Sequence, residues 1–133
     1  MIMKHIGESM LDIDEKELLT SKFKTDNLDE IRRLTSLYLN NLEICMFYAS
    51  PVRFSHSEED VKELMNLSNL YLEIIHDIVD KWHVDNTMNI MSFLDKTTSF
   101  KKYMYRYIET PDEENFIFVE GLYDNLLVHS KKV

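Results

Sequence analysis

Signals for the start of a helix recur along this 133-residue chain, and they constrain its fold more than any other feature. Asp, Asn, Ser and Thr side chains bind the free N–H groups of a helix's first turn, and acidic residues favour that turn. Such residues precede apolar side chains at helical spacing. The predicted helices span about residues 15–24, 28–49, 58–83, 85–108 and 111–129, with caps at Asp14, Asn27, Ser57, Asp85 and Thr110.

Proline helps to set the boundaries of these helices. Pro51 must end the second helix, because a proline disfavours helical geometry in the residue before it. The stretch SPVRFSH, residues 50–56, is therefore predicted to be a connection. Residues 96–99 (KTTS) are poor helix formers and residues 115–119 (NFIFV) resemble a strand. A lone strand would have no partner, so both stretches are predicted to be helical.

Apolar stripes give each long helix a side to bury, and the connections between the helices are short. Short connections place consecutive long helices antiparallel to one another. The sequence therefore predicts an all-α, up-and-down antiparallel helical bundle of four long helices plus a short N-terminal helix. We expect residues 1–133 to form a single all-helical domain, with residues 1–13 as a flexible N-terminal segment.

Composition narrows the range of functions. Apolar residues are 44% of the chain and charged residues 29%, which is typical of a globular protein. A net charge of -9 repels nucleic-acid phosphates, so we expect no direct nucleic acid binding. No stretch has the ~20 apolar residues that cross a membrane, and acidic residues interrupt the N-terminus where a signal peptide would be apolar. A single cysteine suits a reducing compartment, so we predict a cytoplasmic protein without membrane contact.

Residue usage is also skewed. Ala49 is the only alanine, whereas Ile, Asn, Lys, Tyr, Phe and Met are abundant. Such a bias is typical of AT-rich genomes, including those of many phages, large DNA viruses and some bacteria. We therefore expect a phage or viral protein that acts in its host's cytoplasm.

The stretch LEIIHDIVDKWH, residues 72–83, contains the potential metal ligands Glu73, His76, Asp77, Asp80 and His83. At about 100 degrees per residue, these side chains lie opposite the apolar face of the predicted helix. Di-iron bundles direct such ligands inward and spread them over several helices. We therefore expect a solvent-facing polar stripe, no metal site and no cofactor.

The same helix raises an enzymatic alternative. EDVKE, residues 59–63, loosely resembles the Glu-Glu-x-x-Glu motif of all-helical nucleotide pyrophosphohydrolases of the MazG type, which implies magnesium-dependent hydrolysis. EIIHD, residues 73–77, lacks one glutamate of the matching motif. On one straight helix Glu59 and Asp77 would lie about 27 Å apart, so this alternative requires a turn between Asn66 and Asn69. The prediction is that the protein is not an enzyme, with this magnesium-dependent hydrolase as the alternative.

Nucleophilic and phosphate-loop chemistry have less support. Cys45 lies on the apolar face of its predicted helix, where a cysteine acts as a small core residue. With only Gly7 and Gly121, the chain has no glycine-rich phosphate loop. We therefore predict no catalytic residues.

A tryptophan, Trp82, ends the third predicted amphipathic helix, which is similar to some poxvirus Bcl-2-like immune inhibitors. The cellular Bcl-2 signature Asn-Trp-Gly-Arg aligns with residues 81–84, where the tryptophan alone matches. The resemblance implies an inhibitor that binds a host protein. It transfers no functional residues to this chain.

A binding surface is the remaining candidate. The second predicted helix has a second apolar strip opposite its main one, and the connection after it contains Arg and aromatic residues, which often anchor interfaces. We predict a non-catalytic protein-binding or regulatory module that binds a host protein or associates with itself. Its candidate interface residues are Leu37, Ile44, Phe47, Val52, Arg53 and Phe54.

Overall fold

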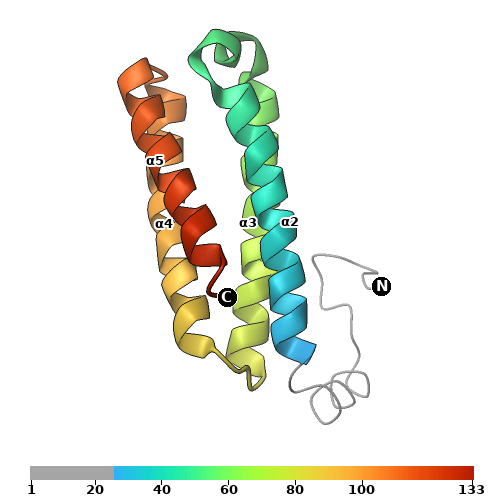
Figure 1. Cartoon of the computed structure of the whole chain (residues 1–133). Helices are drawn as coiled ribbons and strands as arrows, with labels where there is room; N and C mark the ends of the chain where they lie inside the picture. Colours follow the sequence, from blue (N-terminus) through green and yellow to red (C-terminus); the bar gives the residue numbers. More distant parts are fainter. Residues whose placement is uncertain (1–25) are drawn as a thin grey trace.

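The computed structural model describes residues 26–133, and the regular structure in that range is helical (Figure 1). Its four helices are α2 (Asp26–Ala49), α3 (Pro51–Lys81), α4 (Thr87–Glu109) and α5 (Glu113–Ser130). The prediction of an all-α protein with four long helices is confirmed. The predicted helix at about residues 15–24, with its cap Asp14, and the predicted flexible segment 1–13 lie outside the described residues.

The start of α3 corrects one prediction. Only Ser50 connects α2 and α3, and residues 51–56 are helical, because Pro51 occupies the first helical position, where a missing N–H costs nothing. The carbonyl oxygen of Ser50 accepts hydrogen bonds from the amides of Arg53 and Phe54 at 2.8 and 2.9 Å. Ser57, the predicted cap, instead has non-helical dihedrals (φ -130°, ψ 16°) inside the helix. The cap signal therefore marks a kink in α3 and not its beginning.

The N-caps of α4 and α5 lie one and two residues beyond the predicted caps. Asn86 precedes α4 in the left-handed conformation (φ 66°), which asparagine tolerates better than most residues. Asp112 caps α5 in place of Thr110, because its carboxylate accepts a hydrogen bond from the Asn115 amide at 2.8 Å. Residues 96–99 and 115–119 are helical as predicted.

The helices pack as two pairs, α2 with α3 and α4 with α5 (Figure 1). Each pair is joined at the upper end of the view, and residues 82–86 connect the pairs at the lower end. Large aromatic side chains fill the space between the pairs. Tyr38 of α2 meets Phe93 of α4 edge to face at 6.1 Å between ring centroids. The largest fully buried side chains include Tyr38, Phe93, Phe100, Met104, Tyr107 and Leu126.

None of the four described helices has the length and apolar composition needed to cross a membrane.

Candidate protein-interaction surface

The polar stripe of α3 faces solvent, as predicted. Glu73, His76, Asp77 and Asp80 are all exposed, and so is His83 just beyond the helix. Asp77 pairs with Lys81 one turn later, at 3.0 Å. Across residues 26–133, His, Cys, Asp and Glu side chains do not gather in threes with the geometry for holding a metal ion.

The hydrolase alternative requires a turn that α3 does not make. Residues 66–69 are helical, and the one kink in α3 lies earlier, at Ser57. Glu59 and Asp77 therefore stand on one continuous helical stretch, about 27 Å apart along its axis. Carboxylate oxygens that bind one magnesium ion all lie about 2.0–2.1 Å from it. The acidic residues of EDVKE and EIIHD cannot meet around one ion in this arrangement.

Cys45 is a buried core residue, as predicted. Its thiol points toward the carbonyl oxygen of Val61 on α3, with 3.8 Å between sulfur and oxygen. Burial raises the pKa of the Cys45 thiol to about 12. The reactive thiolate is therefore scarce at neutral pH.

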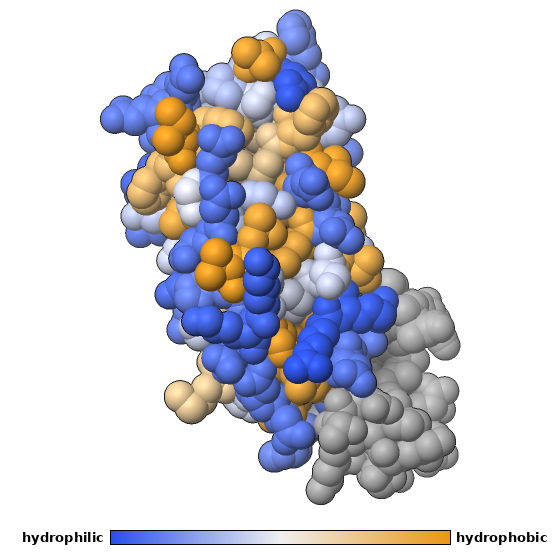
Figure 2. All heavy atoms as spheres, viewed as in Figure 1, coloured by the Kyte–Doolittle hydropathy of each residue, from blue (hydrophilic) through white to orange (hydrophobic). Residues whose placement is uncertain are grey.

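Apolar side chains are exposed where α2 meets α3. Ile44, Phe47 and Val52 are 50%, 56% and 79% exposed. The ring of Phe47 packs edge to face on Tyr48, with 5.4 Å between centroids. We call Ile44, Phe47, Tyr48, Val52 and Arg53 the elbow surface. Figure 2 shows apolar residues among hydrophilic ones at this upper end of the molecule.

Arg53 is fixed within the elbow surface by two contacts. Its guanidinium lies 3.8 Å from the centroid of the Phe47 ring, which is cation–π geometry. Its Nε also donates a hydrogen bond to the carbonyl oxygen of Phe47 at 3.0 Å. Because both contacts reduce the motion of a long side chain, binding through Arg53 would lose less conformational entropy.

Phe54 corrects the predicted set of interface residues. It is only 5% exposed, and its ring lies 5.4 Å from that of Tyr107 on α4. The expectation of an exposed loop phenylalanine is wrong, because the helix that starts at Pro51 turns Phe54 onto the inward face. Leu37 is half-buried, about two turns from Ile44 along α2. The structure therefore leaves Ile44, Phe47 and Val52 exposed, places Arg53 on Phe47, adds Tyr48, and removes Phe54.

Acidic side chains flank the elbow surface in the sequence. Glu43 precedes Ile44, and four exposed acids follow the kink in α3, namely Glu58, Glu59, Asp60 and Glu63. Lys62 is the one base among the latter, and it is paired with Glu58 at 2.9 Å. The segments that flank the elbow surface in sequence therefore carry more acidic than basic side chains.

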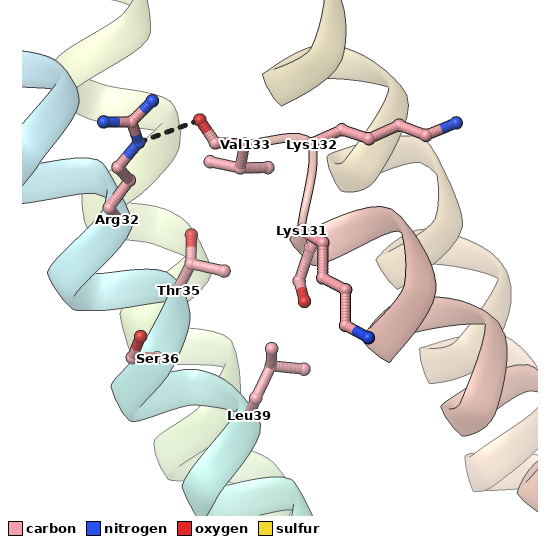
Figure 3. A pocket seen from close by; sticks show the side chains of 8 residues that line it. Arg32, Thr35, Ser36, Leu39, Lys131, Lys132 and Val133 are labelled. Carbon is pink, nitrogen blue, oxygen red and sulfur yellow. Dashed lines mark hydrogen bonds between the residues drawn. The ribbon is translucent and has the colours of Figure 1, made fainter.

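Residues within 26–133 also line open hollows outside the elbow surface. One, of about 640 Å³, is lined by α3, α4 and the residues after α4, and includes Phe54, Tyr105 and Ile108. Another, of about 330 Å³, is lined by α2 and residues 130–133 (Figure 3). There Arg32 Nε donates a hydrogen bond to the Val133 carbonyl oxygen at 3.0 Å. That bond holds the end of α5 against α2, so this hollow is a junction between helices.

Sequence reasoning missed Tyr48 of the elbow surface and the exposed residues of α5. Tyr48 follows Ile44 by one helical turn, so the strip that suggested Ile44 could have included it. Trp82, which carries the Bcl-2-like resemblance, is half-buried at the C-cap of α3. No protein-family model, curated protein or solved structure matches this chain.

Proposed function

We propose that this chain is a non-catalytic protein-binding module with a regulatory role, and that it binds its partner through the elbow surface. One observation carries the proposal: exposed apolar side chains lie beside an arginine that is already fixed on the Phe47 ring. Aromatic and arginine residues contribute most of the binding energy at many interfaces. Half-exposed apolar groups on a helical scaffold become favourable contacts once a partner excludes water from them.

The surroundings of the elbow surface suggest the chemistry of the partner. Acids at Glu43, Glu58, Glu59, Asp60 and Glu63 would attract a segment that places basic residues beside an apolar anchor. The proposal takes the four helices as an up-and-down antiparallel bundle that holds this surface rigid. It also takes the partner to be a host protein in the cytoplasm, in keeping with the AT-rich bias in residue usage.

The test compares affinity capture by the wild-type chain and by Ile44→Asp and Phe47→Asp variants. Met88→Asp is the matched control, because Met88 is 86% exposed at the start of α4. Both elbow variants should keep the wild-type circular dichroism and melting temperature. Charging a central anchor typically costs ~2 kcal/mol or more, so partner binding should weaken about thirtyfold.

Two outcomes would contradict binding through the elbow surface. A folded Phe47→Asp variant that captures every partner of the wild type, with unchanged affinity, would show that the elbow surface is not the binding site. If Met88→Asp and Phe47→Asp weakened partner binding equally, the added negative charge would explain the loss of affinity, and the elbow surface would not.

A further inference from the structure

Helix α5 carries apolar side chains on its buried face and also on a face that the rest of the described chain leaves exposed. Phe116, Val119 and Leu126 are buried, yet Ile117, Phe118 and Val128 are 58%, 51% and 56% exposed. At 100 degrees per residue, these three and Gly121 lie within about 100 degrees of one another. We call Ile117, Phe118, Gly121 and Val128 the α5 face. An exposed group of apolar side chains of this kind often marks an interaction site.

Gly121 is the most unusual member of this face. A glycine in the middle of a helix costs ~1 kcal/mol relative to alanine. A Cβ atom at this position would meet nothing within 4 Å, so packing inside the chain does not require glycine. The absence of a side chain does let another backbone approach closely. Gly121 therefore suits contact with a second helix.

Opposite charges flank the α5 face. Glu113, Glu120 and Asp124 are exposed along its edge away from Phe118. Phe118 packs on Tyr103 of α4, with 4.8 Å between ring centroids. Lys102 and Arg106 lie over that Tyr103 ring, at 5.5 and 4.9 Å from its centroid. The face thus has an acidic edge on α5 and a basic edge on α4, while the exposed Glu114 lies within the face at the N-terminal end of α5.

The ring contacts also fix the levels of these charges along the helices. Phe100 lies beside Tyr123, Tyr103 beside Phe118 and Tyr107 beside Phe116, so residue numbers rise on α5 as they fall on α4. Lys102 therefore lies near the level of Glu120, and Arg106 lies within about one turn of Glu113. The acidic side chains of one edge therefore lie at about the same positions along the helix axes as the basic side chains of the other edge.

We propose that two copies of this chain pair through the α5 face, with their α5 helices parallel about a two-fold axis that runs along them. In a two-fold interface, residue i contacts residue j while j contacts i. A parallel pair places the acidic edge of each copy against the basic edge of the other. An antiparallel pair would place like edges together. Glu113 then faces Arg106 of the second copy and Glu120 faces its Lys102, with the two Gly121 residues near the axis.

This pairing is independent of the function proposed above, because the elbow surface lies on α2 and α3 and stays free on both copies. A dimer would present two elbow surfaces. Loss of pairing and loss of partner capture can therefore be measured separately.

The first experiment measures the mass of the wild-type chain by analytical ultracentrifugation over a range of concentrations. We expect a concentration-dependent dimer, a folded monomer for Phe118→Asp, and a dimer for the control Met88→Asp. A wild-type chain that stays monomeric throughout would overturn the proposal. So would a Phe118→Asp variant that dimerises as well as the wild type.

The second experiment tests whether the two Gly121 residues lie close together in the dimer. A Gly121→Cys variant has room for its side chain, and the buried Cys45 can stay. Mild oxidation should link two chains through residue 121, because the geometry of a disulfide requires Cα atoms within about 7 Å. Met88→Cys should link far more slowly. Equal rates for the two variants would overturn the proposal.

The third experiment tests the direction of pairing. One variant carries Lys102→Glu and Arg106→Glu, and the other carries Glu113→Lys and Glu120→Lys. Each alone should dimerise at least about tenfold more weakly than the wild type, because like charges now face each other. A mixture should form a heterodimer, in which both edges again pair opposite charges. A mixture that recovers no heterodimer would overturn the parallel arrangement.

Discussion

The hydroxyl of Tyr107 on α4 donates a hydrogen bond to the carbonyl oxygen of Ala49, the last residue of α2. Both residues are fully buried. The last carbonyls of a helix lack partners within the helix, and one that is buried needs another donor. Tyr107 supplies that donor from 58 positions away in the sequence. It thereby ties the α4–α5 pair to the joint between α2 and α3, where the elbow surface lies.

Replacing this hydroxyl should destabilise the fold. Tyr107→Phe removes the hydrogen bond and leaves a buried carbonyl oxygen without it, at a cost of about 1–3 kcal/mol. Urea denaturation followed by circular dichroism measures the change. The control Tyr48→Phe removes a hydroxyl from an exposed ring and should change stability by less than about 0.5 kcal/mol. Equal stability of Tyr107→Phe and the wild type would contradict this account of the bond.

Stability should also fall at high pH. Burial raises the pKa of Tyr107 to about 12, whereas an unfolded tyrosine titrates near 10. The folded state therefore holds this proton at pH values where the unfolded state releases it. That contribution is complete below about pH 10 and is lost as pH rises toward about 12. Urea midpoints measured across this range should decline, and Tyr107→Phe should show a smaller decline than the wild type.

The contributions of Asn41 and Ser68 to stability should be coupled. The Asn41 amide donates hydrogen bonds to the Leu64 carbonyl oxygen at 2.8 Å and to the Ser68 hydroxyl at 2.7 Å. Asn41→Ala should cost about 1–3 kcal/mol, whereas Asn40→Ala, at an exposed neighbouring position, should cost much less. A double-mutant cycle with Ser68→Ala should give a coupling energy of about 0.5–3 kcal/mol. Strictly additive effects would refute the coupling.

Cys45 should resist thiol reagents while the protein is folded. Its burial and its pKa of about 12 keep both access and thiolate concentration low. A chromogenic disulfide reagent should therefore react slowly with the native protein and at once in denaturant. Rapid stoichiometric reaction of the native protein would show that Cys45 is accessible.

Phe54 and Phe47 should differ sharply under the same substitution. Phe54 packs against Tyr107, so Phe54→Ala should leave a cavity and cost about 3–5 kcal/mol of stability. Phe47 is 56% exposed, and Phe47→Ala should cost well under 1.5 kcal/mol. Denaturant midpoints of the two variants measure the difference. Similar losses of stability would mean that both residues lie in the core or both on the surface.

The sequence by itself determined the helical class, the four long helices and most of their bounds. Capping and apolar periodicity are local properties, because they act between residues within a few positions of each other. The outward direction of the polar stripe from Glu73 to His83 followed from helical geometry alone. Even the wrong start of α3 had a local cause, since Ser57 does mark a change of backbone geometry there.

Only the tertiary structure decided which apolar residues remain on the surface. Phe54 is buried because Tyr107, 53 positions later, lies against it, and no local pattern encodes that meeting. Arg53 became part of the elbow surface through its contact with Phe47. The exposed face around Gly121 emerged only once α4 had covered the other side of α5. Burial depends on partners distant in sequence, so the helices could be predicted from local signals and the surfaces could not.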